Sequence, residues 1–190
     1  MSFNGGTGCG ASDTLKTLWE DNAAARAAIR DAVRGLSETQ LSFQPAPGRW
    51  SIGEILDHLG LAERAMIRSI SRVLQQAAGL GQIGEPGFME APSCRIDLNL
   101  YNRSAGAPES VLPSLGRPLE RLLAGLEESR ERLHEVTKRA EGRVVGNVTL
   151  PHFQLGELNF YQWLAVEGAH EAKHLEQIRR IKADPAFPRQ

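Results

Sequence analysis

The chain has 190 residues, of which 41% are hydrophobic and 24% are charged, and its formal net charge is -1. These values are typical of one soluble globular domain with an adequate hydrophobic core. Because Lys and Arg residues are interspersed with Asp and Glu, no basic stripe is present and nucleic-acid binding is disfavoured. No run approaches the roughly eighteen apolar residues of a membrane span, and the N-terminus lacks a signal-peptide pattern. We therefore expect no membrane partner and a cytoplasmic location.

The N-terminal segment differs in composition from the rest of the chain. Residues 1–12 are rich in Gly, Ser and Thr, which predicts a flexible tail. Cys9 in this tail and Cys94 in a later irregular segment are interpreted as free, inert thiols. Asp13 is a suitable N-cap for a first amphipathic helix, and Gly35 lies near its expected end.

A second helix has a clear start signal. Ser51 followed by Glu54 predicts a capping box, and Trp50 with Ile55 predicts a hydrophobic staple. Apolar residues then recur at helical spacing to about Ala78.

Two further helices follow, separated by irregular connections. Residues 79–115 hold many Gly and Pro residues and predict a long connection that crosses the bundle or covers part of it. A third helix is expected from about Leu115 to Ala140, and residues 142–154 connect it to a last helix from about Leu155 to Lys182. The charged face of the third helix is expected to be solvated; it comprises Glu120, Arg121, Glu127, Glu128, Arg130, Glu131 and Arg132.

Together the four amphipathic helices predict an all-α fold, a four-helix bundle. Short first and third connections with a long second one predict up-down-down-up order, in which helices two and four are antiparallel. The bundle domain is expected to span residues 13–183, with residues 184–190 as a C-terminal tail. A homodimer is compatible with such a bundle.

Three histidines are the strongest functional signal. His170 and His174 are four residues apart in the last predicted helix, so their rings project from one face. His58 lies about 10 Å from the start of the second helix, and an antiparallel partner brings it to the same level. Three imidazoles leave a coordination position open, which predicts a catalytic divalent-metal site. The alternative is that the histidines are ordinary packing residues.

Other titratable residues are weaker candidates. Glu167 and Glu54 each precede a candidate ligand by one helical turn, so either can accept a ring N–H or act as a base. The favoured interpretation of both is an exposed helical glutamate, and the cap already explains Glu54. His152 can contact substrate or a metal ligand, against the simpler interpretation of a loop histidine. His134 is expected on the surface.

Two segments carry a family resemblance. Residues 48–59, with the sequence GRWSIGEILDHL, and residues 167–178, with the sequence EGAHEAKHLEQI, resemble the two signatures of the DinB/YfiT-like superfamily. Residues 36–41, with the sequence LSETQL, resemble the lead-in to the first signature. The resemblance covers about residues 13–183.

The resemblance implies an up-down-down-up bundle that binds a divalent metal, commonly zinc or nickel, through His58, His170 and His174. It also implies transfer of a low-molecular-weight thiol onto an electrophile, a related isomerisation, or metal-dependent hydrolysis. We therefore expect a small-molecule substrate and an enzyme that is either a thiol S-transferase or a hydrolase. The alternative is a stress-related bundle protein that binds metal or a small ligand without turnover.

Overall fold

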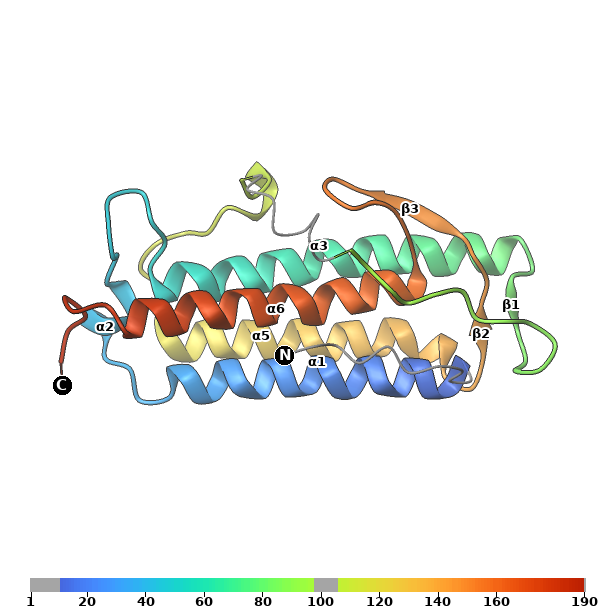
Figure 1. Cartoon of the computed structure of the whole chain (residues 1–190), viewed down its shortest axis with the longest axis horizontal. Coiled ribbons are helices and arrows are strands. Elements are labelled where there is room, and N and C mark those ends of the chain that lie inside the picture. Colours follow the sequence, from blue (N-terminus) through green and yellow to red (C-terminus); the bar gives the residue numbers. More distant parts are fainter. Residues whose placement is uncertain (1–10, 98–105, 190) are drawn as a thin grey trace.

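The computed structural model describes residues 11–97 and 106–189, with side chains from Thr14 onward, and it is mostly helical. The long helices are α1 (Ala11–Val33), α3 (Ile52–Gly79), α5 (Leu119–Thr137) and α6 (Phe160–Lys182). Shorter elements are α2 (Glu38–Ser42) and the 3-10 turns η1 (Glu109–Val111) and η2 (Lys138–Ala140). The four long helices pack side by side, with α1 and α6 running in one direction and α3 and α5 in the other (Figure 1). None of the helices described is long and apolar enough to cross a membrane.

The structure contains short β-strands, which the predicted all-α bundle did not include. β1 (Ile83–Gly84) pairs with β2 (Val144–Val145), and β3 (Thr149–His152) forms a hairpin with β4 (Gly156–Asn159), both antiparallel. The first pair ties the segment after α3 to the segment after α5. The expected irregular connector 142–154 therefore contains strands, and its hairpin lies beside α3 (Figure 1).

Some helix boundaries also differ from the predicted ones. α6 begins at Phe160 rather than Leu155, because Asn159 pairs in the hairpin and forms a capping box with Gln162. α5 begins at Leu119 rather than Leu115, because Pro118 is its N-cap residue and a proline disfavours a helical conformation in the residue before it.

The N-terminal predictions are tested only in part. α1 begins at Ala11, two residues before the predicted cap Asp13, so the expected tail 1–12 is too long by those residues. The rest of that tail, including Cys9, lies outside the described residues. Cys94 is a half-buried free thiol.

The start of α3 follows the prediction closely. The Ser51 side chain accepts a hydrogen bond from the Glu54 backbone N–H, and the Glu54 side chain accepts one from the Ser51 N–H. The predicted capping box is thus confirmed, and it sets the register in which the following turns of α3 face the bundle.

The apolar core is split by a buried polar layer, which we define as Asn22, Arg26, Glu63, Ser129, Arg130, Glu167 and Glu171. One apolar cluster lies on each side of this layer along the four long helices. Arg26 on α1 pairs with Glu63 at 2.9 Å and also with Glu171. Arg130 on α5 pairs with the same two carboxylates at 2.7 and 3.0 Å. The layer therefore joins all four long helices by ion pairs.

Arg130 and Glu167 contradict the prediction that both are solvated. The side chain of Arg130 is only 13% exposed and that of Glu167 only 2% exposed, and the two approach to 3.4 Å. The reason is their helical phase. Arg130 lies four residues after the buried Leu126 and three before the buried Leu133, so it occupies a core position of α5.

Candidate metal centre

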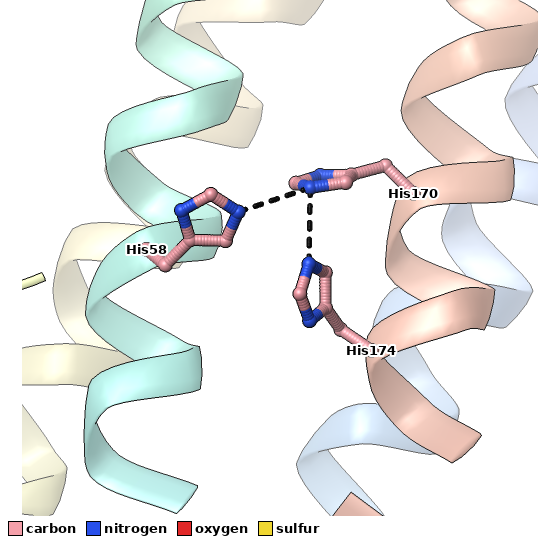
Figure 2. Close-up of side chains that lie close together, drawn as sticks. All are labelled: His58, His170 and His174. Carbon is pink, nitrogen blue, oxygen red and sulfur yellow. Dashed lines mark hydrogen bonds between the residues drawn. The ribbon is translucent and has the colours of Figure 1, made fainter. Parts of the chain in front are cut away.

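The three candidate histidines meet on facing helices. His58 comes from the second turn of α3, whereas His170 and His174 come from one face of α6 (Figure 2). The Nε2 atom of His170 lies 3.1 Å from that of His58 and 3.1 Å from that of His174. All three side chains are buried, and their ligand atoms lie within 4.8 Å of one another. The structure thus brings together the residues that the spacing singled out.

The outer nitrogens of two rings have oxygen partners. His58 Nδ1 lies 2.8 Å from the carbonyl oxygen of Val111, and His174 Nδ1 lies 3.0 Å from the side-chain oxygen of Gln177. These oxygens accept hydrogen bonds, so each Nδ1 carries the single proton of a neutral imidazole. Both Nε2 atoms then point a lone pair at His170. Converging lone pairs repel one another unless a proton or a cation lies between them.

Burial keeps the three rings neutral. Loss of solvation lowers the pKa of His58 and brings that of His174 to about 3. The pKa of His170 is lowered well below its ordinary value, first by burial and then by the neighbouring rings of His174 and His58. Neutral imidazole is the form that binds a metal.

A segment before α5 is anchored to α3 beside the histidines. Asp57 accepts hydrogen bonds from the backbone N–H and the hydroxyl of Ser114, at 2.8 and 2.9 Å, and pairs with Arg117 at 3.1 Å. With the bond between His58 and Val111, two adjacent residues of α3 hold this segment. The segment is thus held against α3 beside the histidines, and its residues Ser110 and Val111 line the adjoining cavity.

A cavity of about 910 Å³ opens onto the histidines. Its walls come from α3, α6, residues 106–111 and the tip of the β3–β4 hairpin. Trp50 lies at one side, with its ring 4.7 Å from that of His58 and 6.3 Å from that of His174. A volume of this size suits a small-molecule ligand.

His152, one of the weaker predicted candidates, also lines this cavity. Its Nδ1 accepts hydrogen bonds from the backbone N–H groups of Gln154 and Leu155, at 3.2 and 3.3 Å, which assigns the proton to Nε2. Its ring lies 5.2 Å from that of Trp163, and burial lowers its pKa to about 4. His152 is therefore a neutral hydrogen-bond donor in the cavity wall.

The remaining candidates lie elsewhere. Glu167 belongs to the buried polar layer, where burial and the charges of Glu63 and Glu171 raise its pKa well above the ordinary value. Glu54 forms the cap of α3 and also accepts a hydrogen bond from Gln44. His134 is exposed, as predicted.

A model of the DinB superfamily matches residues 22–178. The chain belongs to the DinB superfamily. The uncharacterized protein YuaE of Bacillus subtilis strain 168 is 26% identical over 164 residues, which cover 83% of this chain and 93% of YuaE. The crystal structure of TT2238, a four-helix bundle protein, superposes with a TM-score of 0.59 at 22% identity, over 87% of this chain and 98% of TT2238. These findings confirm the predicted family and the four-helix bundle.

In this DinB-superfamily chain, both signature segments contribute to the site. Residues 48–59 supply Trp50, Asp57 and His58, and residues 167–178 supply both histidines of α6 together with Gln177. Sequence reasoning missed the contacts of Asp57 because its partners Ser114 and Arg117 lie far along the chain. It also missed Gln177, although the i,i+3 spacing from His174 was a usable signal. The buried polar layer had a usable signal, since Arg26, Glu63 and Glu171 are charged residues at apolar-stripe positions.

Proposed function

We propose that this protein is a divalent-metal-dependent enzyme that activates a low-molecular-weight thiol for transfer to an electrophile. His58, His170 and His174 would hold the metal, on an up-down-down-up bundle in which α3 and α6 are antiparallel. The observation that carries the proposal is the convergence of three buried Nε2 atoms at the wall of a ligand-sized cavity.

The donor set fits a transition metal. Nitrogens around a tetrahedral zinc ion, with bonds of about 2.0–2.1 Å, lie about 3.3 Å apart. The two measured Nε2–Nε2 distances of 3.1 Å are close to that spacing. Imidazole donors suit zinc and nickel, and three of them leave a position for a substrate atom.

When bound, a metal with three neutral ligands would lower the pKa of a thiol, so that thiolate forms near neutral pH. The reaction would form a carbon–sulfur bond and break the bond from that carbon to its leaving group, with the thiol proton passing to solvent. The chain would bind and orient both reactants within the cavity. No general base is required for this chemistry.

The acid–base groups of the cavity favour thiol transfer over hydrolysis. Among the described lining residues Glu176 is the one carboxylate, and it pairs with Arg179 at 2.5 Å. Hydrolysis remains the second candidate, because water also fits the open position and His152 lines the same cavity. In its assigned tautomer, however, His152 donates a proton rather than accepting one.

Metal and thiol binding test this proposal directly. Full-length protein, dialysed free of metal and then given cobalt(II), should retain about one ion per chain by elemental analysis. Addition of 2-mercaptoethanol should then produce a sulfur-to-cobalt charge-transfer band, and a chromogenic electrophile should be consumed faster than with metal-free protein. Retention of no metal would refute the proposal. Metal without a thiol band, but with ester hydrolysis, would favour the second candidate, and metal without either activity would favour a binding protein without turnover.

The lowered pKa values of the buried histidine rings predict that metal binding releases unusually few protons. Three histidines with an ordinary pKa of about 6.5 would release about two protons on metal binding at pH 6. Here the pKa values of all three rings are lowered, to about 3 for His174, so fewer protons should be released at pH 6. The affinity for zinc should accordingly fall less steeply from pH 7 to pH 5 than it would for three ordinary histidines. Calorimetric titrations in buffers of different ionisation enthalpy measure the protons released, and a value near two would contradict the neutral site.

A further inference from the structure

The cavity extends along α6 to both sides of the histidines. Trp163 lies seven residues before His170, and Arg180 lies six residues after His174, and both line the cavity. At the helical rise of about 1.5 Å per residue, these two walls lie about 10 Å and 9 Å from the nearer histidine. The candidate metal centre is thus near the middle of an elongated site.

Residues of α3, and of the segment just before it, line the same two ends of the cavity, but they follow one another in the opposite direction. Met66 lies eight residues after His58 on α3, while Arg49 comes just before α3 begins, and both line the cavity. Because α3 and α6 are antiparallel (Figure 1), Met66 lies at the Trp163 end and Arg49 at the Arg180 end.

The described residues at the Met66 and Trp163 end are uncharged. The charged lining residues Arg49, Glu176 and Arg180 lie at the other end, and Lys173 lies on α6 between His170 and His174. Glu176 pairs with Arg179, so the balance of this end is positive. Within the part of the chain that the structure describes, Arg49 and Arg180 are exposed and form no ion pair.

The Met66 and Trp163 end is mainly apolar and aromatic. Its described lining residues include Ala62, Ala65, Met66, Pro151, Phe153 and Trp163, and its polar side chains, Ser69, His152 and Gln154, are uncharged. Phe153 at the hairpin tip is 62% exposed, whereas Met66 and Trp163 are buried in the wall. An exposed aromatic side chain at the mouth of a cavity gains apolar contact when a ligand covers it.

On the basis of the proposed function, we infer that the substrate class is an amphipathic carboxylate. Its anionic group lies at the Arg49 and Arg180 end, its apolar group lies at the Met66 and Phe153 end, and the reacting atom lies between them at the histidines. Arginine recognises a carboxylate through paired N–H donors, so two guanidiniums select the anion by geometry as well as charge. The carboxylate can belong to the thiol or to the electrophile.

Two matched pairs of ligands test this inference by calorimetry on full-length protein, with and without bound zinc. The sulfur-free pair is 6-phenylhexanoate with 6-phenylhexanol, and the thiol pair is 6-mercaptohexanoate with 6-mercaptohexanol. At least one acid should bind ten times more tightly than its alcohol. The Arg49→Gln/Arg180→Gln variant should reduce that preference below threefold without weakening the alcohol. The Arg68→Gln/Arg72→Gln variant removes the same charge from the outer face of α3 and should keep the preference.

The outcomes separate the two proposals. A preference in the thiol pair alone assigns the carboxylate to the thiol, and a preference in the sulfur-free pair assigns it to the electrophile. Equal binding of acid and alcohol, or a preference that survives loss of both arginines, overturns the inference even if zinc is retained. A preference found in protein that retains no metal supports the amphipathic site while refuting the metal-dependent function.

Discussion

Replacing His58 by alanine is expected to lower zinc affinity at least about a hundredfold, because loss of a supporting partner alone costs 10–100-fold and His58 is itself a donor. His58 is the one candidate ligand from α3 among the described residues. Its removal leaves only the i,i+4 pair on α6, so a bound metal would no longer link the two helices. Competition titration against a chromophoric chelator measures the affinity. Circular dichroism should show almost unchanged helix content in the metal-free variant.

The matched control is His134→Ala. His134 is exposed on α5 and belongs to the same residue type, but it lies outside the cavity, so zinc affinity should not change. If His58→Ala bound zinc with the wild-type affinity, α3 would supply no metal ligand, and this result would contradict the proposed ligand set. Unfolding of the metal-free variant would instead identify a structural role for the site.

The convergence of the three histidines could be predicted from the sequence for simple physical reasons. His58 follows an unusually complete start signal, and the confirmed capping box fixes its helical phase. The pair on α6 needs only the period of a helix to share a face. The level at which the helices meet follows from rise per residue. These are local properties of the chain together with one antiparallel packing choice, which is why sequence reasoning could reach them.

Sequence reasoning did not identify contacts between residues that lie far apart in the chain, because such contacts are not local properties. Arg130 and Glu167 look like surface residues on polarity alone, and the opposing charges of Glu63 and Arg26, which compensate them in the core, lie on other helices. The β3–β4 hairpin was missed because its strands are only four residues each and its turn depends on Gly156 at a φ of 73°. Helical periodicity carries no information about the hairpin, whereas the phase of Arg130 relative to Leu126 and Leu133 was a usable signal for its core position.

Replacing Arg26 by methionine is expected to lower the free energy of unfolding by about 3–5 kcal/mol, the usual cost of breaking a buried ion pair by removing one partner. Glu63 and Glu171 have side chains that are 0% exposed, and both would lose a guanidinium partner. Methionine keeps much of the volume and leaves the two buried carboxylates to share the single guanidinium of Arg130. Urea unfolding of the metal-free protein measures the loss, and the melting temperature should fall by roughly 10 °C.

Arg30→Met is the matched control, one helical turn further along α1. Its side chain is 58% exposed and its partner Glu127 lies 3.6 Å away, so the loss should stay below about 1 kcal/mol. Adding Glu63→Gln to Arg26→Met should recover part of the stability, because it removes one stranded charge. Equal losses in the two arginine variants would contradict an energetic role for the buried polar layer.

The same layer predicts how pH acts on these variants. The raised pKa of Glu167 means that its contribution to stability is complete below its ordinary pKa of 4.5 and is lost as pH rises through the folded-state pKa. Burial also raises the pKa of Glu171, and the Arg26 charge opposes that rise, so Glu171 should take up a proton more readily without Arg26. The deficit of Arg26→Met relative to wild type should therefore shrink as pH falls from 7 to 5, whereas that of Arg30→Met should not change. A deficit that stays constant over this range would show that lost packing, rather than uncompensated charge, causes the destabilisation.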